Sequence, residues 1–297
     1  MKVLITGASG LIGKALQRSF EEKGWEMLLA SRSEPKDEKH IKWTVEDGFS
    51  DPERLEGIDA VVHLAGESVN GLRWTDEKKK AIRDSRVIGT RNLVDAISKL
   101  KKKPKVLVAS SAIGFYGERG DEEMTESSSA GTGFLPDVSK EWEAESRRAE
   151  DAGIRTVLLR TGIVLSKDGG ALGTMLTPFK FGVGGVVGSG KQWMSWISLD
   201  DQVAIINFVI ENESIRGAVN AVSPNPATNE EFTKTLGDVI YRPTILPLPE
   251  FAVSMMFGEM GDALLLASTK VLPKRLLDAG FEFKYPDLKP AIENAVK

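Results

Sequence analysis

The sequence contains no cysteine, and its only histidines are His40 and His63. Disulfide bonds, thiolate metal sites and cysteine nucleophiles are therefore excluded, and the composition fits a reducing compartment. Zinc requires several nitrogen or sulfur ligands, and two histidines far apart in the sequence do not supply them. We expect a cytoplasmic protein without a metal centre.

Long apolar runs and an excess of basic charge are also missing. No apolar stretch reaches the roughly 18 residues that a membrane-spanning helix requires. The net charge of -4 creates no general attraction for nucleic acid. The N-terminal residues read as a strand and a loop rather than as a signal peptide. We expect a small-molecule substrate as partner, neither nucleic acid nor membrane, with a homodimer left open.

The first 165 residues alternate short apolar runs with amphipathic stretches. This alternation predicts an α/β fold of the Rossmann type, a doubly wound parallel sheet with helices on both faces. Residues 1–165 are predicted to form a dinucleotide-binding domain. Residues 196–222 are predicted to return to it, because 217–222 reads as another buried strand. The glycine-rich and proline-rich remainder, 166–195 and 223–297, is predicted to form a smaller C-terminal substrate lobe.

A glycine pattern, "TGASGLIG", lies between the first strand and the first helix. Gly7 permits a tight turn, Gly10 lets the backbone approach a pyrophosphate, and Gly13 lets helix and strand pack closely. The free N–H groups of the helix N-terminus attract phosphates. We expect a dinucleotide here, and a purely structural turn is the alternative. The predicted contacts of this loop are Gly7, Ser9, Gly10, Leu11, Ile12 and Gly13.

The end of the second strand indicates which dinucleotide is bound. NAD sites usually place an acidic residue there to hold the ribose 2′-hydroxyl. The sequence "ASRS" instead supplies Ser31 and Arg32, and Arg32 can bind a 2′-phosphate through a charge-assisted hydrogen bond. We therefore expect NADP(H) rather than NAD(H). An ordinary exposed loop arginine is the alternative.

Several motifs together resemble the extended short-chain dehydrogenase/reductase superfamily, whose members include NAD(P)-dependent epimerases and dehydratases. They are "TGxxGxxG", "HLAG", "SSAIGFYG" and "WISLDD". The resemblance is closer to one atypical branch, the epimerase family that includes the bacterial YfcH-type proteins. It extends from Met1 almost to the C-terminus, with "RWTDEKKKAIRDSRVIGTRNLV" and "VLPKRLLDAGFEF" as its longer segments.

The resemblance implies further cofactor contacts. Leu64, Ala65 and Gly66 would lie beside the adenosine and its ribose. Arg86 would reach the cofactor from the following helix. Arg160 would face the nicotinamide half, although it could equally hold a buried carboxylate, because buried arginines are normally paired.

Reductases and epimerases of this superfamily use a Tyr-x-x-x-Lys pair and an upstream serine. Residues four apart share a helix face, so the lysine lowers the pKa of the tyrosine, which exchanges a proton with the substrate. Lys140 occupies the lysine position and would also bind the nicotinamide ribose. Pro136 occupies the tyrosine position and Ala112 the serine position. Two of the three catalytic groups are therefore absent.

Three residues could replace them. Tyr116 is the nearest tyrosine, with a role in the pocket wall as the alternative. Ser111 could shift into the position of the serine. Glu67, just past "HLAG", is expected on the substrate side, where it could act as an acid if its pKa were raised, or it could be a solvated loop residue.

Two aromatic clusters suggest a substrate pocket. Arg73 and Trp74 form one, and Trp193 and Trp196 form the other. By family analogy both would face a cleft beside the nicotinamide and hold a flat or anionic substrate, with a core between the lobes as the alternative. We expect Asp200 and Asp201 to cap a helix that starts near Gln202.

Two functions remain open. The first is an NADP(H)-dependent, epimerase-like oxidoreductase acting on a small carbonyl, hydroxyl or nucleotide-sugar-like substrate. The second is a non-catalytic NADP(H)-binding protein with a redox-sensing or regulatory role. The missing tyrosine favours the second, and the retained Lys140 favours the first.

Overall fold

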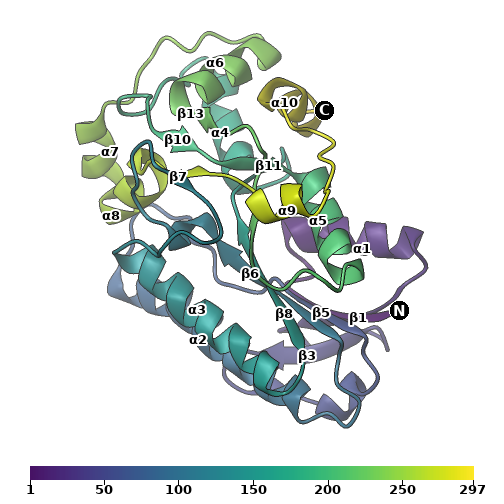
Figure 1. Cartoon of the computed structure of the whole chain (residues 1–297). Helices are drawn as coiled ribbons and strands as arrows, with labels where there is room; N and C mark the ends of the chain where they lie inside the picture. Colours follow the sequence, from purple (N-terminus) through teal and green to yellow (C-terminus); the bar gives the residue numbers. More distant parts are fainter.

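The computed structural model describes all 297 residues. An eight-stranded sheet with the order β12-β8-β6-β5-β1-β2-β3-β4 forms its centre (Figure 1). All of its strand pairs are parallel except β3–β4. The strands are β1 (Lys2–Thr6), β2 (Glu26–Ser31), β3 (His40–Thr44), β4 (Gly48–Phe49), β5 (Ala60–His63), β6 (Val106–Ala112), β8 (Arg155–Thr161) and β12 (Gly217–Ala221).

The sheet is buried on both faces, which explains why its strands read as continuous apolar runs. Helices α1 (Leu11–Glu22) and α5 (Leu199–Glu211) pack on one face, through a core that includes Phe20 and Ile206. Helices α2 (Asp76–Ser98) and α3 (Phe134–Asp151) pack on the other. The predicted doubly wound α/β fold is confirmed. Its strand order reverses between β1 and β5, where such folds bind their ligands.

The start of α5 differs from the sequence prediction. The helix begins at Leu199, and the side chain of Ser198 caps it by accepting a hydrogen bond from the Asp201 N–H group. Asp201 is completely buried, and its carboxylate accepts from Ser198 and from the backbone of Lys284 and Tyr285. Asp201 therefore joins the helix start to the C-terminal segment rather than capping the helix itself.

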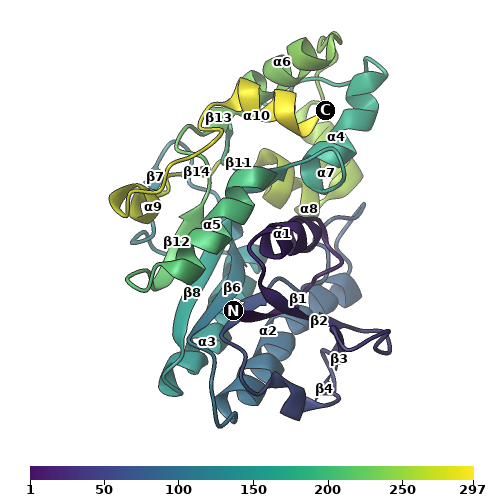
Figure 2. The same ribbon diagram turned by 90° about the vertical axis from the view of Figure 1, so that its right-hand side faces the viewer.

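A smaller lobe lies above the carboxyl edge of the sheet (Figures 1 and 2). Its own core includes Phe179, Phe232 and Ile292. Its helices are α4 (Gly170–Lys180), α6 (Asn229–Ile240), α7 (Glu250–Phe257), α8 (Glu259–Gly261) and α10 (Leu288–Ala295). Helix α9 (Lys274–Asp278) instead packs against β12, and its Leu276 belongs to the core that α1 and α5 share with the sheet. Short strand pairs complete the chain: β9 (Ile163–Leu165) with β11 (Trp196–Ser198), β10 (Trp193–Met194) with β13 (Ala227–Thr228), and β7 (Glu123–Met124) with β14 (Lys270–Val271).

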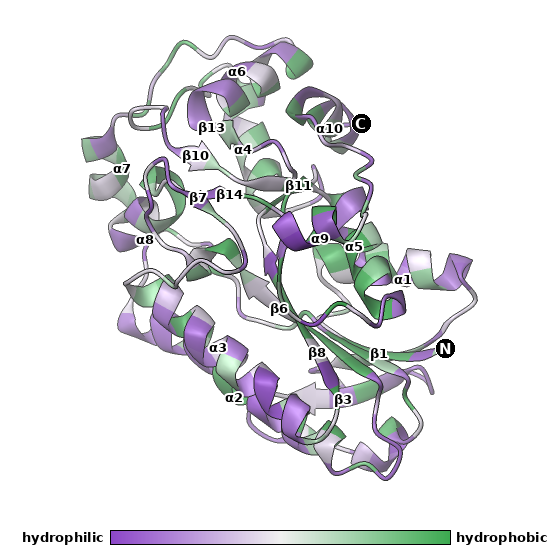
Figure 3. Cartoon of the chain, viewed as in Figure 1, coloured by the Kyte–Doolittle hydropathy of each residue, from purple (hydrophilic) through white to green (hydrophobic).

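The distribution of apolar residues follows this layering. Figure 3 shows apolar colour on the central strands and mixed or polar colour along α2 and α3, whose outer faces meet solvent. None of the helices combines the length and the apolar character that crossing a bilayer demands. The acidic and histidine side chains do not gather into a group that could hold a metal ion.

Candidate functional site

The glycine loop between β1 and α1 is packed too closely for a side chain at Gly7 or Gly13. Gly7 has a φ of +70°, and a Cβ atom there would lie 2.8 Å from the carbonyl carbon of Leu64. A Cβ at Gly13 would lie 2.4 Å from the carbonyl oxygen of Gly7. The loop therefore needs glycine at both positions, one for the turn and one for the contact between helix and strand.

The N-terminus of α1 is open to a ligand. Gly10 caps the helix without a side-chain hydrogen bond, and no acidic residue lies in its first turn. Ser9 and Gly10 are exposed, while Leu11 and Ile12 are half-buried. Free N–H groups and the positive end of the helix dipole favour an anion here, so the loop fits the pyrophosphate of a dinucleotide.

The end of β2 carries a free cation. Ser31 donates a hydrogen bond to the carbonyl oxygen of Ser33, which closes the turn after the strand. Arg32 is exposed and forms no ion pair or hydrogen bond within the chain. Its guanidinium group is available to a phosphate at the edge where β1 and β2 end together.

The end of β5 is held against β1 by a buried histidine. His63 lies between the hydroxyl groups of Thr6 (2.7 Å) and Thr90 (2.9 Å), and Thr6 also accepts a hydrogen bond from the N–H group of Ala65. Burial lowers the pKa of His63 to about 4, so the ring is neutral at pH 7. This neutral link fixes the following residues Leu64, Ala65 and Gly66 beside the glycine loop.

Arg86 approaches the same place from α2. Its Nη1 donates to the carbonyl oxygens of Glu67 (2.9 Å) and Ile82 (3.0 Å), and its guanidinium lies over the ring of Trp142. Its Nε and Nη2 atoms donate to no protein acceptor. Neither is among the fully buried side-chain atoms of the chain that lack a hydrogen-bond partner. Burial lowers the pKa of Arg86 to about 10, still far above neutrality. Arg86 is therefore a charged group with donors to spare beside Gly66.

Glu67 does not have the raised pKa that an acid catalyst would need. Its carboxylate pairs with Lys78 at 2.6 Å. The hydrogen bond from Lys78, followed by the charges of Lys78, Arg32 and Arg86, lowers the pKa of Glu67 below its usual value. The carboxylate is ionised at pH 7, so the predicted role of Glu67 as a proton donor is wrong for this geometry.

The segment that should carry the Tyr-Lys pair begins α3. Pro136 is buried in the first turn, where proline is tolerated because those N–H groups have no partner within the helix. Its ring packs close to Gly117. Lys140, one turn later, is exposed and pairs with Asp137 at 2.7 Å. A hydrophobic packing residue therefore stands where the family places its tyrosine.

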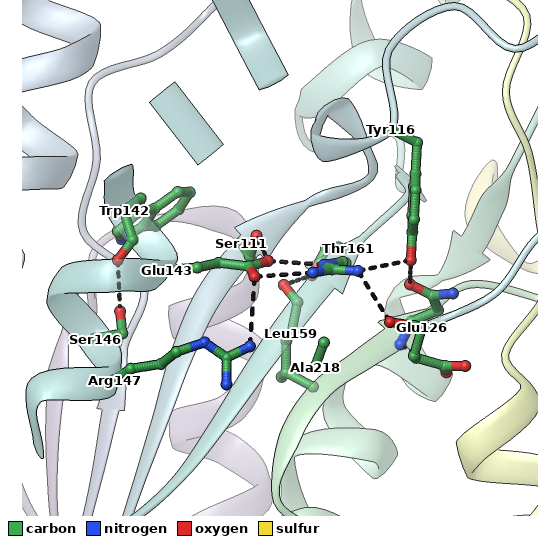
Figure 4. Close-up of polar contacts among 12 residues, drawn as sticks. Ser111, Tyr116, Glu126, Trp142, Glu143, Ser146, Arg147, Leu159, Thr161 and Ala218 are labelled. Atoms are coloured by element: carbon green, nitrogen blue, oxygen red, sulfur yellow. Dashed lines mark hydrogen bonds and ion pairs between the residues drawn. The ribbon is translucent and has the colours of Figure 1, made fainter. Parts of the chain in front are cut away.

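A buried network occupies the region behind this segment (Figure 4). Arg160 binds both carboxylate oxygens of Glu143, at 2.7 and 2.9 Å, and donates to the hydroxyl oxygen of Tyr116 at 3.0 Å. The guanidinium also lies over the ring of Phe115. Ser111 donates to Glu143 at 2.8 Å.

These contacts correct three predicted roles. Arg160 is almost completely buried and pairs with a carboxylate instead of facing the nicotinamide, which is the alternative that the sequence left open. The Tyr116 hydroxyl lies 2.7 Å from Asn220 Oδ1 and 3.0 Å from the carbonyl oxygen of Thr125, and burial raises its pKa. Tyr116 and Ser111 therefore have their protons engaged inside the protein, and neither faces a substrate.

The two aromatic clusters have separate environments. Trp196 is completely buried in the core of the smaller lobe, so its predicted contact with substrate is wrong. Trp193 is half-buried, donates to Asp121 and lies under Lys270. Trp74 donates to the carbonyl oxygen of Val69 and packs edge-on against Phe134 at the start of α3. Arg73 donates to the carbonyl oxygens of Met255 and Met256 and so joins the domain to the end of α7.

Sequence reasoning missed Glu143, Asn220 and Lys78. Glu143 and Lys78 lie on amphipathic helices rich in charge, where nothing local distinguishes a buried carboxylate or a site lysine from a solvated one. The unexplained Arg160 inside an apolar strand was the one available signal, since a buried arginine requires an acidic partner. Two surface hollows, of 380 and 260 Å³, lie between α6 and α10 and between α2 and α3, away from this edge.

The parallel sheet, the bare glycine loop and the free helix N-terminus define a dinucleotide-binding protein of the short-chain dehydrogenase/reductase type. The chain belongs to the NAD-dependent epimerase/dehydratase family, whose model matches residues 3–221. A second model, described as a domain of unknown function (DUF1731), matches residues 248–295 in the smaller lobe. The family resemblance noted in the sequence is confirmed.

Full-length relatives occur in bacteria and animals. The chain is 40% identical to an epimerase family protein of Mycobacterium bovis over 98% of its length and 96% of the relative. It is 37% identical to the epimerase family protein YfhF of Bacillus subtilis, covering 100% of this chain and 98% of that one. The human epimerase family protein SDR39U1 is 36% identical over the full length of both chains.

Solved structures agree with this placement. Human SDR39U1, crystallised with NADPH, superposes with a TM-score of 0.91 at 35% identity, over 99% of each chain. A nucleoside-diphosphate sugar epimerase from Corynebacterium glutamicum gives 0.83 at 35% identity, over 100% of this chain and 58% of that one. UDP-glucose 4-epimerase from Thermus thermophilus, solved with NAD, gives 0.78 at 18% identity and shows the shared fold.

Proposed function

We propose that this chain binds NADP(H) and acts as an epimerase-like oxidoreductase on a small carbonyl, hydroxyl or nucleotide-sugar-like substrate. The observation that carries the proposal is the edge formed by the ends of β1, β2 and β5. It combines a glycine loop that leaves no room for a side chain at Gly7 or Gly13 with a free Arg32, and no carboxylate lies at residues 31–33. The human relative that was crystallised with NADPH supports the choice of dinucleotide.

The residues present fit this cofactor. The loop from Gly7 to Gly13 would hold the pyrophosphate, Arg32 the 2′-phosphate, and residues 64–66 the adenosine. Lys140, on the exposed face of α3, would hold the nicotinamide ribose. When bound, the nicotinamide ring would accept or supply a hydride.

The reaction half of the site is the region around the end of β6 and the start of α3, where the nicotinamide is expected. It would function without the tyrosine that other members of the family use. Ser111, Tyr116 and Arg160 fix the end of β6 and the following turn through buried hydrogen bonds. The smaller lobe, residues 166–195 and 223–297, would supply the substrate side, with Trp193 at its partly exposed surface. Lys140 is then an exposed cation on α3, where it pairs with Asp137.

A second function is favoured by one specific observation. The hydroxyl group of Tyr116 and that of Ser111 are both engaged by buried protein groups, and Glu67 is ionised beside Lys78. An NADP(H)-binding protein that senses the redox state of the dinucleotide, without turning over a substrate, would need no proton donor.

Two titrations test cofactor binding, and a substrate screen then separates the two candidate functions. Purified protein, freed of carried-over nucleotide, is titrated with NADPH and with NADH by following tryptophan quenching. We expect tight binding of NADPH and much weaker binding of NADH. A screen of carbonyl substrates, with NADPH oxidation as the readout, then separates enzyme from sensor. Lys140→Met should abolish any turnover found. Absence of binding by folded protein would contradict both functions.

A further inference from the structure

Glu67, which directly follows residues 64–66 at the adenosine end of the site, is held by three hydrogen bonds to α2. The N–H group of Glu67 donates to Ser85 Oγ at 2.9 Å, and its carbonyl oxygen accepts from Arg86 at 2.9 Å. Its carboxylate binds Lys78 Nζ at 2.6 Å. Lys78 and Ser85 are seven residues apart, which is about two helical turns, so they project from the same face of α2. Both the backbone and the side chain of Glu67 are therefore fixed.

This held carboxylate lies near the end of β2. β2 and β5 are the two neighbours of β1, and adjacent strands are about 4.8 Å apart, so their ends lie about 10 Å apart across the glycine loop. Arg32 follows β2 and Glu67 follows β5. Lys78 pairs with this carboxylate, and Arg32 and Arg86 are near enough for their charges to lower the pKa of Glu67. Both arginines have donors that no protein group uses.

A carboxylate beside the adenosine ribose is the device with which NAD sites repel a 2′-phosphate. Here the carboxylate comes from β5 rather than β2, and an ion pair neutralises it. Without Lys78, the charge of Glu67 would face a phosphate bound at Arg32 and weaken its binding, because charges within this range interact across a partly buried edge.

We propose that Glu67, Lys78 and Arg86 form a selectivity cluster, in which Lys78 neutralises Glu67 so that a phosphate on the adenosine ribose is accepted. The proposal rests on the proposed function, because it assumes that a dinucleotide occupies this edge. It assigns Lys78 a role in choosing the cofactor and gives Glu67 an electrostatic role in place of acid catalysis. The ligand group concerned is a phosphomonoester.

The test compares dissociation constants for NADPH and NADH by calorimetry. Lys78→Met should weaken NADPH binding about fivefold and change NADH binding less than about twofold, since only NADPH carries the extra phosphate. Glu67→Gln should bind NADPH at least as tightly as the native chain. The double variant should return to about the affinity of the native chain, because the pair carries no net charge in either protein.

The chain offers a matched control. Lys80 lies on the exposed side of α2 and pairs with Asp84 in the same helix, so Lys80→Met removes an equal charge outside the cluster. It should leave both dissociation constants unchanged. Thermal unfolding of each variant verifies that folded protein is compared.

Two results would overturn the proposal, and they are distinguishable. If the native chain binds neither dinucleotide, the proposed function fails and the cluster fails with it. If the native chain prefers NADPH and Arg32→Ala removes that preference, but Lys78→Met weakens both dinucleotides equally or neither, the cofactor assignment stands. In that case the selectivity cluster alone is refuted.

Discussion

The candidate site has an adenosine half, at the ends of β1, β2 and β5, and a reaction half, around the end of β6 and the start of α3. The two halves differ in whether their polar groups are bound by other groups of the protein. At the adenosine half, Arg32 has no partner, no side chain caps the N-terminus of α1, and Arg86 has donors that no protein group uses. At the reaction half, Arg160, Glu143 and Tyr116 bind one another inside the protein (Figure 4). Unused donors indicate a surface prepared for a ligand, whereas satisfied ones indicate structure. The adenosine half therefore leaves polar groups free, whereas the reaction half uses them within the fold.

The largest effect is expected from breaking the reaction half. Arg160→Met leaves the carboxylate of Glu143 buried without its bidentate partner, which should cost about 3–5 kcal/mol of unfolding free energy. Arg147 also approaches Glu143, at 3.8 Å, but is 44% exposed, so Arg147→Met should cost less than about 1 kcal/mol. Guanidinium unfolding of both variants measures the difference. Equal costs would show that the network is not a structural element.

The next prediction concerns the adenosine half. Gly13→Ala places a Cβ atom against the backbone of the loop and should cost about 2–3 kcal/mol of stability, with loss of dinucleotide binding. Gly10 has a φ of -76°, and its Cβ would lie 3.2 Å from the Gly7 carbonyl oxygen. Gly10→Ala should therefore weaken binding at least about tenfold, with a stability change below about 1 kcal/mol. Intact binding in Gly10→Ala would contradict the placement of the pyrophosphate.

A pH titration tests the hydrogen-bonded link that His63 forms between Thr6 and Thr90 below the adenosine half. The unfolded chain protonates His63 near pH 6.5, whereas the folded chain does so only near pH 4. The unfolded state therefore binds more protons between these values, and acidification favours unfolding. From pH 7.5 to pH 5 this histidine should cost about 2 kcal/mol. Unfolding curves of the native chain and His63→Gln at both pH values measure it, and an equal pH dependence in the two would refute a buried neutral ring.

The smallest effect is expected from Tyr116. Tyr116→Phe removes the hydroxyl that contacts Arg160 and Asn220, which should cost about 1–2 kcal/mol of stability. NADPH affinity should remain within about twofold of the native value, because the hydroxyl lies in the reaction half. If a substrate is found, turnover should survive as well. A selective loss of turnover in folded Tyr116→Phe would restore this residue as a proton donor.

The sequence predicted the adenosine half better than the reaction half for a physical reason. The glycine loop and the "ASRS" turn are local patterns, in which the required backbone and the ligand contact come from adjacent residues. The state of Arg160 and Tyr116 depends on Glu143 and Asn220, which join them only after the sheet has formed. The sequence suggested a pocket position for Trp196. It could not separate a pocket from a core, because an indole ring suits both environments.

The resemblance predicts that Pro136 replaces a catalytic tyrosine, but the sequence does not predict how the neighbouring residues pack. Pro136 is a packing residue at the start of α3, and the first turn of a helix accepts it without distortion. The sequence did not show that the neighbouring Tyr116 is completely buried, or that its hydroxyl group is hydrogen-bonded to three protein groups. Side-chain burial of this kind follows from packing between distant segments.

The central claim is that the adenosine half binds the 2′-phosphate of the dinucleotide. Its most direct test is a phosphorus NMR titration of bound NADP⁺. A free phosphomonoester takes up its second proton near about pH 6. Beside Arg32 and Arg86 the bound 2′-phosphate should stay a dianion down to about pH 5.5, since nearby cations favour its charged form. In Arg32→Ala it should titrate close to its free value. A bound 2′-phosphate that titrates like free NADP⁺ in the native chain would contradict the account.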